Sequence, residues 1–229
     1  MHQITSADDM ERVIREVGII PFFPCAIPGY SIQELTHPDY WFGGDKDSLG
    51  PWDWKISCIQ SGDIAYGKFL CGGKASFATV PLYRELMNMR RALSEPDEKG
   101  RRIMEQISSQ GSISMKEVRT LLNVRKAAAD SAMAKLEHQC RVVVGDIMRR
   151  YDGPYLTYKG WQVSSFCMPE SLFENDFAAS QFPGFPFAGG GQTLHTNHTP
   201  EESLEVLIKH ISGLFPSGVS RGQILKVLK

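Results

Sequence analysis

Residues 113–136 read ISMKEVRTLLNVRKAAADSAMAKL, a pattern that predicts two helices joined by a short turn. Ser114 precedes Glu117 by three residues, which is the spacing of an N-terminal capping box. Apolar residues recur at helical spacing in both segments, namely Val118, Leu121 and Leu122 and then Ala129, Ala132, Met133 and Leu136. A helix-turn-helix unit is therefore predicted here.

The flanking sequence extends this unit. Residues 99–109 have a helical apolar face, and residues 141–148 and 155–165 are predicted strands on either side of a basic turn at 149–154. Helix, helix, helix and hairpin is the order of a winged helix-turn-helix module. We assign that module to residues 98–165.

Residues 1–97 are predicted to form a helical region that contains a β-hairpin. A first helix ends at Gly18, and a second one starts at Pro51, a residue favoured in the first helical turn. Two alternating segments around Gly72 and Gly73 predict the hairpin. A third helix, at about 81–93, closes the region.

Residues 166–229 are predicted to hold a long loop rich in phenylalanine and glycine, at about 173–198, followed by a helical pair. The apolar spacing of residues 207–228 mirrors that of residues 103–122. This similarity indicates either a partial second helix-turn-helix unit or a coincidence between two amphipathic pairs. The predicted fold class is α+β, mainly helical.

Composition points to a soluble protein with an uneven charge. The chain has 229 residues, 42% hydrophobic content and a net charge of −1. Residues 98–162 hold 12 Lys and Arg against 7 Asp and Glu, whereas residues 1–97 hold 9 against 13 and residues 163–229 hold 4 against 6. The start of the chain does not resemble a signal peptide, no run of apolar residues is long enough to span a membrane, and five scattered cysteines fit a reducing compartment. We expect a cytoplasmic protein without a membrane partner.

The basic central segment favours DNA as a partner. The third helix of the module would face a major groove with Lys126 and Ser131, with Arg125 near a phosphate, and the wing would add Arg149 and Arg150. The alternative is that these side chains are solvated charges on a module that binds protein, because a fold does not fix a function.

Two segments in the first region combine aromatic residues with lysines, which suits stacking of an unpaired base. They supply the candidate base pocket: Trp52, Trp54, Lys55, Tyr66 and Lys68. Ordinary core packing is the alternative explanation for the tryptophans. Asp53 and Asp63 lie close by in sequence and are candidates for activating water.

The remaining motifs predict neither a metal nor a cofactor. His195 and His198 have no further ligand at a supporting spacing, and the Gly189–Gly191 run lacks a phosphate-binding pattern. No cysteine stands in a nucleophile signature, so the cysteines are expected to be buried small residues.

Several of these segments resemble a known family. Pro51-Trp-Asp-Trp-Lys55, Tyr66-Gly-Lys-Phe69, Gly160-Trp161 and Met168-Pro-Glu170, together with the central module, resemble proteins related to AlkZ, the helix-turn-helix DNA glycosylase family that includes YcaQ. The resemblance implies tandem winged-helix units and descent from enzymes that excise alkylated or cross-linked bases. Those enzymes carry a Gln-x-Gln or Gln-x-Asp catalytic pair, and this sequence contains neither pattern.

Three hypotheses of function follow. The first is a winged-helix protein that binds DNA, including damaged or distorted DNA, without catalysis. The second is a glycosylase-like base-excision enzyme with other catalytic residues. The third is a protein-interaction module, which the acidic flanking regions would suit.

Overall fold

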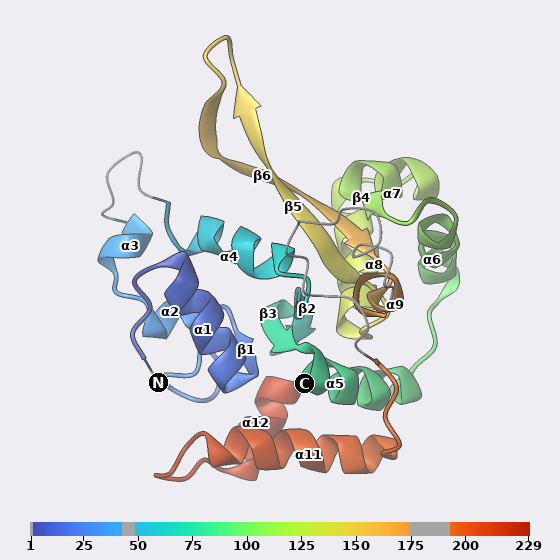
Figure 1. Cartoon of the computed structure of the whole chain (residues 1–229). Helices are drawn as coiled ribbons and strands as arrows, with labels where there is room; N and C mark the ends of the chain where they lie inside the picture. The colour runs from blue at the N-terminus through green and yellow to red at the C-terminus, as the bar shows by residue number, and fades with distance from the viewer. Residues whose placement is uncertain (1, 43–48, 175–192) are drawn as a thin grey trace.

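The computed structural model describes residues 2–42, 49–174 and 193–229 and consists of helices with two small antiparallel sheets (Figure 1). This mixture confirms the predicted α+β class. The first sheet contains β1 (Ile19–Pro21), β2 (Ile64–Leu70) and β3 (Lys74–Thr79), in the order β1-β3-β2. The second contains β4 (Ile113–Ser114), β5 (Val143–Asp152) and β6 (Thr157–Cys167), in the order β4-β6-β5. The two sheets therefore share one topology.

The helices before the two sheets end in the same way. Helix α1 (Ala7–Val17) ends at Gly18 with φ of 77°, and α6 (Glu98–Gln110) ends at Gly111 with φ of 82°. A side chain is disfavoured at such angles, whereas glycine adopts them freely. In each case an edge strand of the sheet begins within two residues, so the glycine turns the chain directly from helix to sheet.

The same order continues through both segments. In the first, α2 (Ile32–Leu35), α3 (Asp39–Phe42) and α4 (Pro51–Gln60) precede the β2–β3 hairpin. In the second, α7 (Met115–Leu122) and α8 (Lys126–His138) precede the β5–β6 hairpin. Residues 7–79 and 98–167 are thus two units with one chain order and one sheet order, apart from the extra helix α3. We call them the first unit and the second unit.

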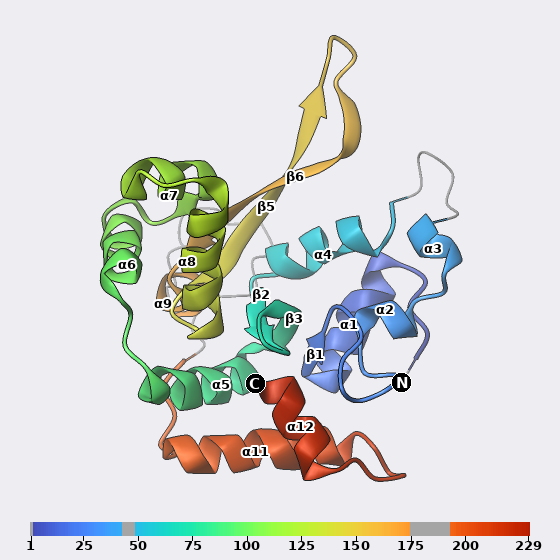
Figure 2. The ribbon, with the colours of Figure 1, turned by 180° about the vertical axis from the view of Figure 1, so that it is seen from behind.

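The C-terminal helices contact the first sheet and the helix that follows it. Both predicted helices are present, as α11 (Pro200–Gly213) and α12 (Arg221–Leu228). Helix α11 lies against α5 (Val80–Leu93), and both views show this pair at the end of the molecule opposite the hairpin tip (Figures 1 and 2). The backbone N–H of Cys71 donates to the carbonyl of Val227, which fastens α12 to the β2–β3 turn. The repeated topology relates the first unit to the second unit.

The end of α12 is also held by a buried cation. Arg90, on α5, is 4% exposed. Its guanidinium donates to the carbonyl of Phe69 at 3.1 Å, to the carbonyl of Leu228, and toward the ring of His138. One side chain therefore joins the first sheet, α12 and α8.

The elements predicted between residues 98 and 165 are all present, and Ser114 and Glu117 form the expected capping box. The predicted position of the turn between the last two strands was wrong. Pairing continues beyond Met148, because Arg149 lies opposite Gln162 and Tyr151 opposite Tyr158. The turn follows Asp152, so Arg149 and Arg150 lie within β5.

The outer half of the β5–β6 hairpin extends beyond the rest of the molecule (Figures 1 and 2). Large apolar side chains are exposed along it, including Tyr155 at 91%, Leu156 at 71% and Trp161 at 67%. Such a cluster on a projecting element is typical of a contact surface.

Three of the five cysteines, Cys58, Cys140 and Cys167, are buried as expected, whereas Cys25 and Cys71 are half-buried. The predicted aromatic loop at 173–198 lies largely outside the described residues. No helix in the described part of the chain is long and apolar enough to cross a membrane.

Candidate functional site

A cavity of about 230 Å³ lies between the first and second units. Its walls come from α4, β2 and β3 of the first unit and from α7, α8, β5 and β6 of the second. Four of the five predicted pocket residues line it: Trp52, Lys55, Tyr66 and Lys68. Trp52 is 43% exposed and Lys68 is exposed, so the cavity meets solvent beside them.

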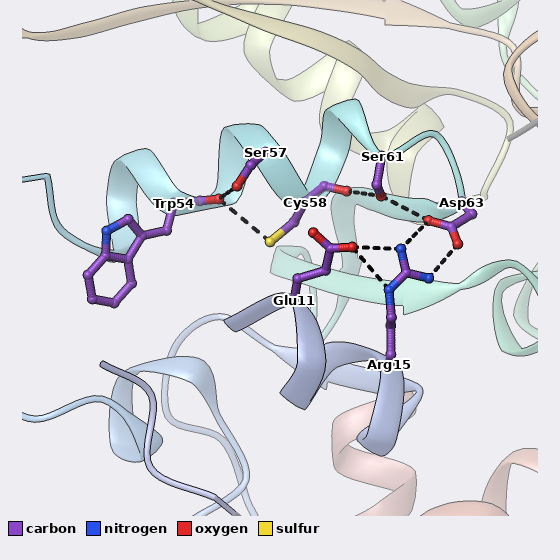
Figure 3. Close-up of polar contacts among 7 residues, drawn as sticks. All are labelled: Glu11, Arg15, Trp54, Ser57, Cys58, Ser61 and Asp63. Carbon is purple, nitrogen blue, oxygen red and sulfur yellow. Dashed lines mark hydrogen bonds and ion pairs between the residues drawn. The ribbon is translucent and has the colours of Figure 1, made fainter. Parts of the chain in front are cut away.

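Trp54, the fifth predicted pocket residue, is buried away from the cavity lining. Its ring packs against that of Tyr40, with 5.5 Å between centroids. Its carbonyl accepts hydrogen bonds from Ser57 and Cys58 within α4 (Figure 3). For this tryptophan the core-packing explanation applies.

Lys55 places an amine in the wall of the cavity. The residue is only 2% exposed. Its Nζ donates to the carbonyl of Trp52 and to Oε1 of Gln162, and it lies 3.7 Å from the centroid of the Trp52 ring. Burial lowers the pKa of Lys55 to about 7; Asp53 opposes this shift and Arg149 adds to it. The amine therefore has substantial neutral and charged populations near neutral pH.

Glu137, on α8, is a second buried titratable group in the cavity wall, and the sequence analysis missed it. It is 2% exposed, and its Oε1 accepts a hydrogen bond from the backbone N–H of Lys68 at 3.3 Å. Burial raises the pKa of Glu137 to about 7, against the opposing effects of Lys68 and of this hydrogen bond. A carboxyl with a pKa near 7 can both take up and release a proton at neutral pH.

A glycine makes room for this carboxyl. A Cβ at Gly67 would lie 3.3 Å from Glu137 Oε1, which is tighter than most contacts of real Cβ atoms. The sequence did contain a signal for Glu137, because it follows the buried Ala129 and Met133 by eight and four residues. A carboxylate on the apolar face of a helix is unusual enough to mark a site.

Asp53 does not line the cavity but joins α4 to the hairpin. Its Oδ1 accepts hydrogen bonds from Arg149 at 3.0 Å, from the Tyr158 hydroxyl at 2.6 Å and from Gln162 Nε2 at 3.2 Å. Since these donors occupy its oxygen, the carboxylate acts in positioning the hairpin. Gln162 contacts both Asp53 and Lys55, so this network reaches the cavity wall.

Asp63 lies at the other end of α4, where it contacts α1. Both of its oxygens accept hydrogen bonds from Arg15, which also pairs with Glu11, and Ser61 donates to it at 2.8 Å (Figure 3). This ion pair fastens α1 to the turn before β2. The structure therefore brings neither predicted catalytic carboxylate into the cavity.

The five predicted DNA-contacting residues divide into two groups. Arg125, Lys126 and Ser131 are exposed, with Arg125 at the N-cap of α8. Within the described ranges, neither Arg125 nor Lys126 forms an ion pair. On β5, Arg149 pairs with Asp53 at 3.0 Å, and the more exposed Arg150 pairs with Asp152 at 3.2 Å. Of the four cations in this set, the two that form no ion pair with a described residue therefore lie at the start of α8.

The two histidines that were considered as metal ligands do not gather other ligands. His198 Nδ1 lies 2.9 Å from the buried carboxylate of Glu85, which also accepts from Ser203, and His195 is exposed. Among the described residues, no group of three or more His, Cys, Asp or Glu side chains could hold a metal ion. His198, Glu85 and Ser203 instead join α5 to the start of α11.

In this protein, two similar helix-and-hairpin units enclose a small cavity, and its wall contains the buried carboxyl of Glu137 and the buried amine of Lys55. A family model described as AlkZ related matches residues 4–229, and the chain belongs to this family. No curated protein and no solved structure is significantly similar to it.

Proposed function

We propose that the second unit is a winged helix that binds DNA, with α8 directed into the major groove and the β5–β6 hairpin as the wing. The observation that carries this proposal is the position of Arg125 and Lys126 at the N-terminal end of α8, where both are exposed and form no ion pair with any residue that the structure describes. In winged-helix and related proteins, the N-terminal part of this helix contacts base edges while nearby cations contact phosphates. The first unit, with the same topology, packs beside it as a tandem copy.

The surface of α8 suits a close approach to DNA. Ala127 and Ala128, in its first turn, are exposed and small, and Ser131 follows one turn later. The hairpin adds the exposed Arg150 and Lys159. These side chains belong to the one segment of the chain with a positive charge balance.

The cavity favours DNA that is damaged or distorted. Trp52 and Tyr66 offer aromatic faces, while Lys68 at the opening can contact a phosphate. An unpaired nucleotide costs less to move out of the stack than a paired one, so such a cavity selects sites where pairing is already weak.

The DNA proposal is tested by reversing the two charges on α8. The double variant Arg125→Glu, Lys126→Glu is expected to bind a fluorescent duplex at least about tenfold more weakly at low salt. Loss of the phosphate contact of Arg125 also lowers the magnitude of the slope of log affinity against log salt by about 1. Fluorescence anisotropy across a salt series measures both quantities.

A matched control is available on the opposite side of the molecule. Lys209→Glu, Lys226→Glu makes the same change in net charge on α11 and α12, where both lysines are exposed. This variant is expected to bind as the wild type does. Equal weakening in both variants, or no binding by the wild type at low salt, would reject DNA binding through α8 and favour a protein-interaction module.

Glu137 supports a second candidate function, excision of a base by hydrolysis of its glycosidic bond. A buried carboxyl with a pKa near 7 is suited to activating water. Family membership connects the chain to glycosylases, although it lacks their Gln-x-Gln and Gln-x-Asp patterns. In this proposal Glu137 replaces Asp53 and Asp63, which are held in ion pairs outside the cavity lining.

Excision is tested by incubating the protein with alkylated duplex DNA and counting abasic sites. Glu137→Gln keeps the shape of the side chain and an acceptor for the N–H of Lys68, but it cannot take up a proton. We expect it to lower the excision rate by about 100-fold or more, without weakening DNA binding. Equal rates in the two proteins would exclude Glu137 as the base, and the absence of abasic sites with wild type would exclude excision of these lesions.

A further inference from the structure

We propose that the cavity captures abasic sites in DNA covalently, through an imine between Lys55 Nζ and the C1′ aldehyde of the ring-opened sugar. This inference rests on the proposed DNA binding and goes beyond it, because it assigns a nucleophile and a substrate class to the cavity. It concerns a different bond from the one that base excision breaks.

The first argument is the position of the amine. Lys55 is 2% exposed, yet it lines a cavity that opens beside Trp52 and Lys68. A ligand therefore meets this amine only by entering the cavity. Exposed lysines on the outer surface lack such a restriction.

The second argument is the hydrogen bonding of Nζ. Its two protein partners, the carbonyl of Trp52 and Oε1 of Gln162, are both acceptors. A neutral amine has two N–H groups and one lone pair, so it can keep both hydrogen bonds after losing a proton. The two bonds hold the nitrogen in place while the lone pair remains available.

The third argument is the protonation state. A lysine with a pKa of 10.5 is neutral in about one molecule in 3000 at pH 7, whereas a pKa of about 7 makes about half of the molecules neutral. Desolvation in a protein interior is the usual way in which an amine that forms imines is activated.

The fourth argument is size. The cavity measures about 230 Å³, below the range of roughly 300–1,000 Å³ that is typical of pockets for larger small molecules. A sugar that has lost its base needs less room than a complete nucleoside. Lys68 at the opening is placed to contact a flanking phosphate.

The step balances without an oxidant or a reductant. The lone pair of Nζ attacks C1′, and the electron pair of the C=O bond moves to oxygen, which takes a proton. The nitrogen releases one proton, which gives the neutral carbinolamine. The hydroxyl of the carbinolamine then takes a second proton and leaves as water, while the lone pair of the nitrogen forms the C=N bond and the nitrogen releases its second proton. Amine and aldehyde have become an imine and one molecule of water.

The test is reductive trapping on the full chain. An abasic duplex is incubated with the protein and sodium borohydride, which reduces the imine to a stable amine, and peptides are mapped by mass spectrometry. We expect a cross-linked species in which the peptide containing Lys55 carries the adduct. Lys55→Gln should lower trapping at least tenfold, whereas Lys74→Gln, on β3 outside the cavity lining, should trap as the wild type does.

Anisotropy with the same abasic duplex separates the two proposals. If the protein binds the abasic duplex but no adduct forms at Lys55, or if the adduct maps to another amine, the imine proposal is rejected and the DNA-binding proposal stands. Where Lys55→Gln does not fold, the mapped position in the wild type decides.

A measurement without DNA tests the reactivity of the Lys55 amine independently of DNA binding. With formaldehyde and a borane reductant at pH 7, Lys55 should be methylated at least tenfold faster than Lys74. Failure of DNA binding with preferential methylation of Lys55 would reject the DNA proposal and, with it, the capture of abasic DNA, but it would leave the activated amine. Failure of both would reject the activated amine as well.

Discussion

The free energy of unfolding is expected to fall by up to about 1.4 kcal/mol per pH unit between pH 5 and 7 because of Glu137. The pKa of its carboxyl rises from 4.5 to about 7 on folding. Between these values the folded state binds more protons than the unfolded state. The stabilisation is therefore fully present below pH 4.5 and lost as the pH rises through 7, and it amounts to about 3 kcal/mol in all.

Chemical denaturation of the wild type and Glu137→Gln over this range measures the effect, since other titrating groups cancel in the difference between the two proteins. The difference in the free energy of unfolding between the two proteins should change by up to about 1.4 kcal/mol per pH unit between pH 5 and 7, and it should no longer change with pH above 7. A difference that does not change with pH would show that Glu137 is ionised in the folded state at pH 5.

The contribution of Lys55 to the free energy of unfolding is expected to change with pH in the opposite direction. Its pKa falls from 10.5 to about 7 on folding, so the unfolded state binds more protons above pH 7 and stability rises with pH. The comparison with Lys55→Met is therefore made between pH 7 and 9, where its stability relative to the wild type should fall with pH.

The second large effect is expected at Arg90. The variant Arg90→Met should lose about 3–4 kcal/mol of stability, because the carbonyls of Phe69 and Leu228 lose a buried donor. Each buried polar group left without a partner costs about 1–3 kcal/mol. The midpoint of urea unfolding at pH 7 measures the loss.

The same substitution at an exposed arginine provides the control. Arg12 is 55% exposed, and among the described residues it pairs with Asp9 alone, one turn away on α1. Arg12→Met should therefore cost less than about 1 kcal/mol. Similar losses in the two variants would mean that the Arg90 contacts contribute no more than a surface pair does.

Local sequence signals predicted the longer helices, but not the short helices α2 and α3, which form where a loop was expected. The capping box at Ser114 and the glycines at 18 and 111 act on backbone groups within one turn, so they can be recognised in the sequence itself. β1 was not predicted, because three residues form a strand only where a partner such as β3 is available. The repeated topology was expected only from the family resemblance, which implies tandem units, since the sheet order depends on pairing between distant segments.

The candidate site could be predicted only in part. The combination of aromatic residues and lysines in α4 and β2 predicted four of the lining residues. Glu137 reaches them from α8, 69 residues beyond Lys68 in sequence. The ion pairs of Asp53 and Asp63 could not be predicted from the sequence either, because their partners Arg149 and Arg15 lie far from them in the chain.

The side-chain amide of Gln162 connects the β5–β6 hairpin to the amine of Lys55 through hydrogen bonds. Its oxygen accepts from Lys55, and its nitrogen donates to Asp53. Rotating the amide by half a turn would place N–H groups against the amine and oxygen against the carboxylate, so its orientation is fixed at both ends. A force that bends the hairpin away from α4 strains both contacts together. Any displacement of the hairpin relative to α4 would therefore change the hydrogen bonding of Lys55 Nζ.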